Sequence, residues 1–166
     1  MILHLTNINS ENLESDIILN KNLTNISSSN MYEILFDSES FDEIFNIVLQ
    51  KLKEFTNQNF DTYVKNMWGY IQNDDDFINF NMAFKDQVSI MPEYSFIHLV
   101  NSENTDVFLK NENDVVEKIN LNKGEILIFK TNSYLSETSQ NKKRIVLIGS
   151  LASVDENTTL IKKMLI

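Results

Sequence analysis

The sequence predicts a mainly β protein, an antiparallel sandwich or barrel (α+β overall), with an N-terminal amphipathic helix packed on one sheet. From Thr62 onward, nearly every segment is a short run of aromatic and β-branched residues bounded by polar clusters, which is typical of strands. No helical pattern alternates with these runs, which favours antiparallel pairing. The chain has 166 residues, 42% of them hydrophobic, which is enough for one core and one domain.

Within this single domain, 1–166, we expect N-terminal strands and a helix in 1–60, a β core in 61–151 and a C-terminal extension in 152–166. The expected core strands are 62–71, 77–84, 94–100, 106–110, 115–120, 125–129 and 144–151. Short strands are also expected at 1–6 and 31–36. The polar segment 6–30 could add a short strand or pack as a covering loop, and 158–166 could be a helix or a final strand.

One helix is clearly indicated, and it begins at Ser40. The residues Ser40-Phe41-Asp42-Glu43 form the pattern of a capping box, in which side chains bond the free amides of the first turn. Apolar residues then recur at helical spacing: Phe41, Ile44, Phe45, Val48, Leu49, Leu52 and Phe55. This helix should lie flat against a sheet, with its polar face in solvent.

Composition excludes several functions. The chain has no cysteine, which excludes disulfides and thiolate chemistry, and only two histidines, His4 and His98, which limits transition-metal ligands. A net charge of −10 without a basic stripe argues against nucleic acid as a partner. Neither a signal peptide nor an apolar run of the roughly 20 residues needed to span a membrane is present, so we expect a protein that is not secreted and not bound to membrane.

A family resemblance rests on five features: Trp68, Asp76-Phe77, Tyr94-Ser95-Phe96-Ile97, Gly124 to Phe129, and Arg144 to Leu151. In their order and spacing, these residues resemble the 2-oxoglutarate- and iron(II)-dependent oxygenase-like proteins of tailed marine bacteriophages and related bacteria. The likeness covers about residues 63 to 151. It implies a double-stranded β-helix, or jelly roll, and a place in a virion or in the host cytoplasm.

The resemblance also implies where iron ligands should stand, and this sequence lacks them there. A histidine and a carboxylate, or a second histidine, would occupy Asn81 and Ala83, and a distal histidine would occupy Leu135 or Ser136. The family's cosubstrate arginine matches Arg144, the only arginine in the chain. The serine that should follow two residues later is replaced by Val146, which cannot donate a hydrogen bond. We therefore interpret the chain as a degenerate member.

The two histidines are interpreted as structural rather than as ligands. Alternation on the expected strand places His98 on the face opposite Ile97 and Leu99, together with Phe96 and Val100. A histidine among such neighbours is more often a hydrogen-bonded core or rim residue than a metal ligand, and the same holds for His4, at the start of the sequence.

Two other polar runs are candidate sites, one for a divalent cation and one for nucleophilic catalysis. The run Asp74-Asp75-Asp76 offers carboxylates to Ca²⁺ or Mg²⁺ but lacks the alternating spacing of a binding loop, so a solvated turn is favoured. A second candidate is a nucleophilic triad in the hydroxyl-rich run Tyr134, Ser136, Glu137, Thr138 and Ser139. This run contains no histidine that could act as the base, so the triad is not favoured.

Three functional hypotheses follow. The first is a non-catalytic jelly roll without cofactors that binds other protein subunits, either virion proteins or further copies of itself, or has a structural role in a virion. The second is an active 2-oxoglutarate- and iron(II)-dependent dioxygenase that recruits His98, Asp76 or Glu137 and keeps Arg144 as its cosubstrate anchor. The third is a metal-free pocket in which Arg144 binds a carboxylate, against the simpler interpretation of a surface arginine beside Lys142 and Lys143.

Overall fold

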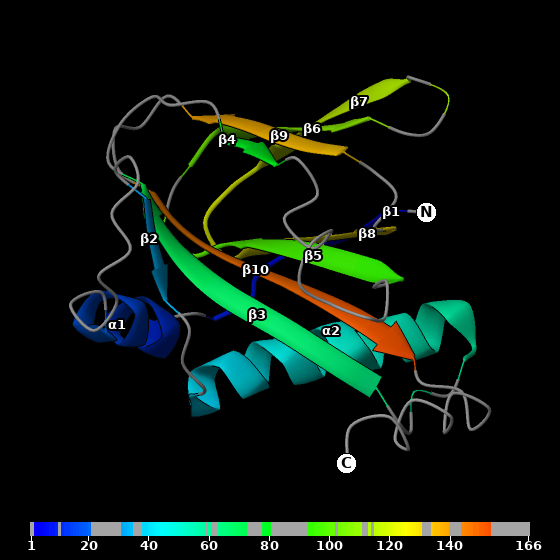
Figure 1. Cartoon of the computed structure of the whole chain (residues 1–166), viewed down its shortest axis with the longest axis horizontal. Coiled ribbons are helices and arrows are strands. Elements are labelled where there is room, and N and C mark those ends of the chain that lie inside the picture. The colour runs from blue at the N-terminus through cyan, green and yellow to red at the C-terminus, as the bar shows by residue number, and fades with distance from the viewer. Residues whose placement is uncertain are drawn as a thin grey trace, which may run out of the picture.

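The fold consists of two facing antiparallel sheets, with two helices on the outer side of the larger sheet (Figure 1). The computed structural model describes residues 2–9, 11–20, 31–34, 38–58, 60, 63–72, 78–80, 93–101, 103–110, 113, 115–130, 134–139 and 144–153. The described elements are, in chain order, β1 (Ile2–Leu5), α1 (Glu11–Asn20), β2 (Met31–Ile34), α2 (Glu39–Thr56), β3 (Tyr63–Gln72), β4 (Ile78–Phe80), β5 (Tyr94–Leu99), β6 (Thr105–Lys110), β7 (Val116–Leu121), β8 (Glu125–Lys130), β9 (Tyr134–Ser139) and β10 (Arg144–Ser153).

The strand order confirms the predicted jelly roll. The larger sheet has the order β1-β8-β5-β10-β3-β2, and the smaller sheet has the order β4-β9-β6-β7. From β3 to β10 the chain alternates between the two sheets, except at the β6–β7 hairpin. Two sheets interleaved in this way form a double-stranded β-helix.

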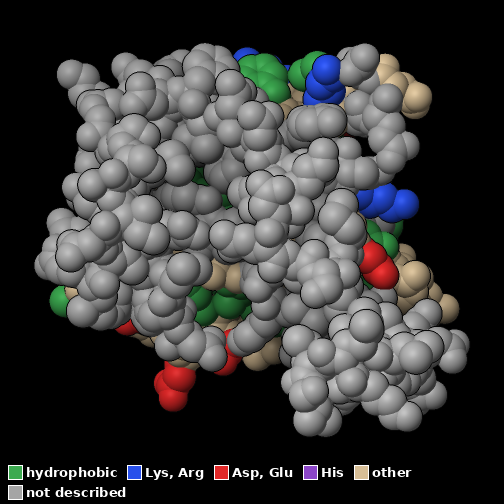
Figure 2. Space-filling view, viewed as in Figure 1, with side chains coloured by type: hydrophobic (Ala, Val, Ile, Leu, Met, Phe, Trp, Pro, Cys, Tyr) green, Lys and Arg blue, Asp and Glu red, His purple; other side chains and the backbone are tan. Residues whose placement is uncertain are grey.

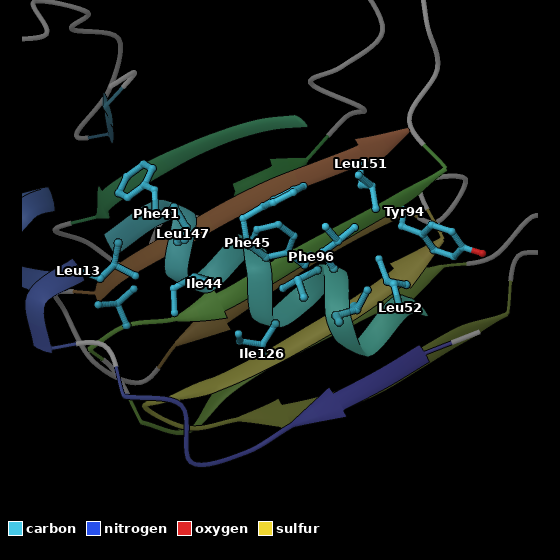
Figure 3. Close-up of a cluster of buried hydrophobic side chains, with 14 of the residues drawn as sticks. Leu13, Phe41, Ile44, Phe45, Leu52, Tyr94, Phe96, Ile126, Leu147 and Leu151 are labelled. Atoms are coloured by element: carbon cyan, nitrogen blue, oxygen red, sulfur yellow. The ribbon is translucent and has the colours of Figure 1, made fainter. Parts of the chain in front are cut away.

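The larger sheet separates two hydrophobic clusters, and alternation along β5 shows how they divide. Phe96 and Val100 belong to the outer cluster, between the sheet and the helices, whereas Ile97 and Leu99 belong to the inner cluster, between the two sheets. Figure 3 shows α2 lying across the sheet with outer-cluster side chains between them. The inner cluster, which is the barrel interior, consists of Ile97, Leu99, Val107, Leu109, Leu121, Leu127, Phe129, Val146 and Ile148.

Helix α2 follows its predicted apolar stripe, but its start differs from the predicted capping box. The N-cap is Ser38, whose Oγ accepts a hydrogen bond from the Phe41 amide at 3.3 Å. Ser40 instead donates a hydrogen bond to Asp16 on α1, so its hydroxyl joins the two helices. Ser38 and Ser40 stand two residues apart and are both good capping residues, so sequence alone could not choose between them.

The predicted stripe is wrong at its last member, since 57% of Phe55 is exposed. Helical spacing identifies which face of α2 carries the apolar residues, but it does not tell whether the sheet extends beneath the final turn. The other stripe members, from Phe41 to Leu52, are buried.

Residues 11–20 form a helix, α1, where the sequence indicated a short strand or a covering loop. Among the described side chains of α1, only Leu13 and Ile17, four residues apart, are fully buried, so the apolar pattern is too sparse to predict a helix. Ile17 packs over Gly69 on β3, where an added Cβ would lie 3.0 Å from Cγ1 of Ile17. The missing side chain of Gly69 therefore lets α1 approach the sheet closely.

One strand was missed, and another is described only in part. Strand β9 was not predicted, because its hydroxyl-rich sequence lacks the apolar alternation of a strand, yet it pairs with both β4 and β6. Strand β4 is described over 78–80 of the predicted 77–84, and residues 77 and 81–84 lie outside the described part of the chain. The predictions for 74–76 and 158–166 also lie outside it.

Candidate functional site

His98 is fully buried on the outer face of the larger sheet, beneath the helices. Its register partners on the neighbouring strands, Ile126 on β8 and Leu147 on β10, both belong to the outer cluster. The predicted face is therefore confirmed. Because the ring stands on the side of the sheet away from the barrel interior, His98 cannot act as an inward ligand.

The hydrogen bond of His98 fixes its tautomer. Nδ1 lies 3.0 Å from the backbone carbonyl oxygen of Glu125, which can only accept, so Nδ1 carries the proton in the neutral ring. Nε2 is then the bare nitrogen, and it has no hydrogen-bond partner among the described residues. Burial lowers the pKa of His98 to about 4, although the bond to Glu125 acts in the opposite direction. His98 is thus a neutral core residue at pH 7.

His4 lies at the edge of the larger sheet, where it contacts one carboxylate. It belongs to no group of possible metal ligands among the described residues. Its Nε2 stands 3.0 Å from Oε2 of Glu125, and the same oxygen accepts the backbone amide of Asn122 at 2.8 Å. Sequence reasoning missed this role of Glu125, which follows the tight turn at Gly124 (φ 79°). The bonds of Glu125 join β1 to the β7–β8 turn.

The described side chains of the barrel interior are mainly apolar, with a few buried hydroxyls among them. Along with the inner cluster, alternation adds three buried hydroxyl residues to this face, Ser95, Thr105 and Ser150, and Ser95 is paired with Ser150 across β5 and β10. Hydroxyls that carry no charge are poor ligands for iron(II). Among the described residues, no group of three histidine, cysteine, aspartate or glutamate side chains could hold a metal ion. This part of the chain does not fit an iron site.

The positions that the resemblance assigns to iron ligands are described only in part. Asn81 and Ala83 lie outside the described residues. Leu135 and Ser136 lie on β9, where they are in register with Leu109 and Phe108 of β6. Leu109 packs in the inner cluster.

Arg144 is the first residue of β10, where its backbone pairs with Gln72 of β3. Val146 follows on the same strand and packs in the inner cluster, where the resemblance would place a serine. The position at which the resemblance expects a serine to bind the cosubstrate carboxylate therefore holds an aliphatic side chain. Two other residues are candidate iron ligands under the dioxygenase hypothesis. Asp76 lies outside the described residues, and Glu137 is in register with Val107.

A separate charged cluster lies on the outer face of the smaller sheet. Nζ of Lys118 is 2.8 Å from Asp106 and 5.8 Å from the ring centre of Phe108, and Asn120 also donates to Asp106. The lysine and asparagine hydrogen bonds lower the pKa of the Asp106 carboxyl. Figure 2 shows lysine and apolar side chains side by side at the top of the molecule, over β6 and β7. With one carboxylate, this cluster is a solvated sheet face and not a metal site.

The architecture is that of the oxygenase-type double-stranded β-helix. A Pseudomonas putida prolyl-4-hydroxylase matches with a TM-score of 0.68 at 9% identity, over 93% of each chain. A Burkholderia pseudomallei oxidoreductase of the 2OG-Fe(II) oxygenase family matches with a TM-score of 0.67 at 11% identity, over 92% of this chain and 84% of that one.

A viral collagen prolyl hydroxylase of Paramecium Bursaria Chlorella virus-1 has a TM-score of 0.64 at 10% identity, over 93% of this chain and 90% of its own. The TM-scores show a shared fold, and at such low sequence identity the likeness does not extend to the chemistry. No family model and no curated protein matches the chain. None of the described helices is long and apolar enough to cross a membrane.

Proposed function

We propose that this chain is an oxygenase-type jelly roll that no longer holds iron and serves as a non-catalytic protein-binding or structural subunit, in a virion or in the infected cell. The observation that carries the proposal is the placement of the histidines. His98 is committed to the outer core with a pKa of about 4, and His4 is bound to Glu125 at the sheet edge. A chain without cysteine has no thiolate, and beyond these two histidines it has no imidazole to offer.

The apolar interior supports the same proposal for the cosubstrate. 2-Oxoglutarate carries two carboxylates, which need charged or hydrogen-bonding partners when they leave water. The described interior of β5 and β10 offers the aliphatic side chains of Ile97, Leu99, Val146 and Ile148, together with the uncharged hydroxyls of Ser95 and Ser150. Among these described side chains, a dianion has no charged partner.

A protein partner is favoured over other partners by charge. The net charge of −10 opposes binding to phosphate backbones, and edge strands without a further partner among the described strands provide surfaces for other chains. Mass spectrometry of purified virions would test the setting. A fixed copy number per particle supports a structural role, whereas absence from the particle points to a partner in the infected cell.

The test of the lost iron centre is thermal unfolding under anaerobic conditions with iron(II), with 2-oxoglutarate, and with both. A ligand at 100 times its Kd stabilises the native state by about 2.7 kcal/mol, which for a domain of this size raises Tm by roughly 5–10 °C. We expect no shift with either ligand or with the pair. A shift that needs both ligands and that disappears in Arg144→Gln would refute the proposal in favour of an active dioxygenase with other ligands.

If 2-oxoglutarate alone raised Tm, and Arg144→Gln removed the effect, the metal-free carboxylate pocket would be the correct function. His98→Leu serves as the control for relocated iron ligands, since iron binding that uses His98 is lost in this variant. The shift on adding ligand is compared within each variant, so a change in the starting Tm does not affect the result.

A further inference from the structure

The edge strands of the two sheets differ in chemistry. Strand β7, at one edge of the smaller sheet, carries Glu117 and Lys118, both exposed, and such charges oppose pairing with a further strand. Strand β1, at one edge of the larger sheet, has the sequence Ile-Leu-His-Leu, without a carboxylate, lysine, arginine or proline. None of the described strands pairs with its outer edge.

Both hydrophobic clusters extend to β1 and are incompletely covered there. Leu3 and Leu5 pack against the outer cluster and Ile2 against the inner one, yet all three are only partly buried. On the adjacent strand, residues 126–129 are buried. A strand laid along the outer edge of β1 would therefore cover apolar side chains on both faces of the sheet.

The edge is held in place rather than loosely attached. Residues 2–5 pair with 126–129 of β8, and His4 contacts Glu125 at 3.0 Å. Beyond the strand, the amide of Ile8 donates to the carbonyl of Gly124 at 2.9 Å. The outward backbone groups of β1 are thus fixed in extended geometry before any partner arrives, which lowers the entropy cost of adding a strand.

We propose that the outer edge of β1 pairs antiparallel with β1 of a second copy of this chain, which joins two larger sheets into one continuous sheet. The proposal rests on the protein-binding role above and names its partner. A two-fold axis perpendicular to the sheet leaves each face of the sheet on the same side in both copies. Directly opposite side chains then share a face only if the axis passes midway between one residue and the same residue of the partner subunit. With the axis at Leu3 or at His4, Leu3 lies opposite Leu3 or Leu5 of the partner subunit, on the face covered by the helices.

A second copy fits this edge better than an unrelated strand. The strand has no formal charge to select an unlike partner, and its leucines match themselves under the two-fold axis. Because β1 has only four residues, the pairing is expected to be weak and concentration-dependent.

The chain has no native cysteine, so single cysteines report directly on the pairing. Opposite residues in antiparallel strands have Cα atoms about 4.5–5.5 Å apart, within the range of a disulfide. We expect Leu3→Cys or His4→Cys to cross-link into dimers under mild oxidation at least about tenfold faster than Val116→Cys, an exposed control on the β7 edge. Equal rates for the three variants would overturn the proposal.

Sedimentation velocity provides the second measurement. The unmodified chain at about 100 µM should contain dimers, which Leu3→Lys removes and Val116→Lys leaves unchanged. A well-folded chain that is monomeric throughout this range would refute self-pairing. If Leu3→Lys does not fold, the cysteine variants still decide. Iron titration tests the proposed function separately: a dimer that binds iron would refute the loss of the iron centre and leave the edge pairing intact.

Discussion

The buried His98 makes the stability of this protein sensitive to mild acid. Its pKa is lowered from 6.5 to about 4 by burial, so between these values the unfolded chain binds a proton that the native state excludes. Stability is therefore fully present above pH 6.5 and falls as the pH drops toward 4. Below pH 4 both states are protonated, and this group causes no further loss. The perturbation is a change of pH, compared between the unmodified chain and His98→Leu.

The size of the effect follows from the two pKa values. One pKa unit corresponds to 1.36 kcal/mol, so His98 alone should lower the free energy of unfolding by about 2 kcal/mol at pH 5 and about 3 kcal/mol at pH 4. His98→Leu lacks this contribution. It loses the bond to the Glu125 carbonyl, which costs about 1 kcal/mol at pH 7, and it also removes the unpartnered Nε2.

Urea unfolding at pH 7, 6 and 5 measures the effect, in a range where most carboxylates remain ionised. His4→Gln is the matched control, because it removes the other histidine and should retain the loss of stability. If the free energy of unfolding fell equally with pH in the unmodified chain and in His98→Leu, the reasoning would be refuted. A nuclear magnetic resonance titration in which His98 takes up its proton near pH 6.5 would refute it as well.

Four substitutions test the packing and the helix cap by chemical unfolding. Gly149→Ala should destabilise the fold by about 1–3 kcal/mol, because the new Cβ would lie 2.3 Å from a ring carbon of Phe96; a loss below 0.5 kcal/mol contradicts this. Ser38→Ala should cost about 1 kcal/mol by removing the N-cap of α2, whereas no change would mean that another residue caps the helix. Leu52→Ala, at a fully buried site, should cost about 2–5 kcal/mol, against less than about 0.5 kcal/mol for Phe55→Ala in the same helix, and similar values would refute the assigned faces.

The sequence predicted those elements whose burial repeats with a clear period. The stripe from Phe41 to Leu52 predicted α2, and short aromatic and β-branched runs predicted most strands. Helix α1 was missed because, among its described side chains, only Leu13 and Ile17 are fully buried, and the adjacent Ile18 and Leu19 blur the helical spacing. Strand β9 was missed because its position between β4 and β6 comes from the sheet and not from its own residue pattern.

The candidate site shows the same division. Alternation was sufficient to place His98 on the face away from Ile97 and Leu99, since it depends on neighbours in the same strand. The carbonyl that receives its Nδ1 proton belongs to Glu125, 27 residues later, and only the register of β5 with β8 brings the two together. Likewise, only the pairing of β9 with β6 brings positions 135 and 136 into register with Leu109 and Phe108.

The most direct test of the loss of the iron centre is the iron content of the purified chain after anaerobic dialysis against iron(II) and 2-oxoglutarate. Since both histidines have structural roles and the described interior is mainly apolar, the protein should retain iron at a ratio close to zero per chain. Retention of about one iron per chain that survives removal of free metal would contradict this account.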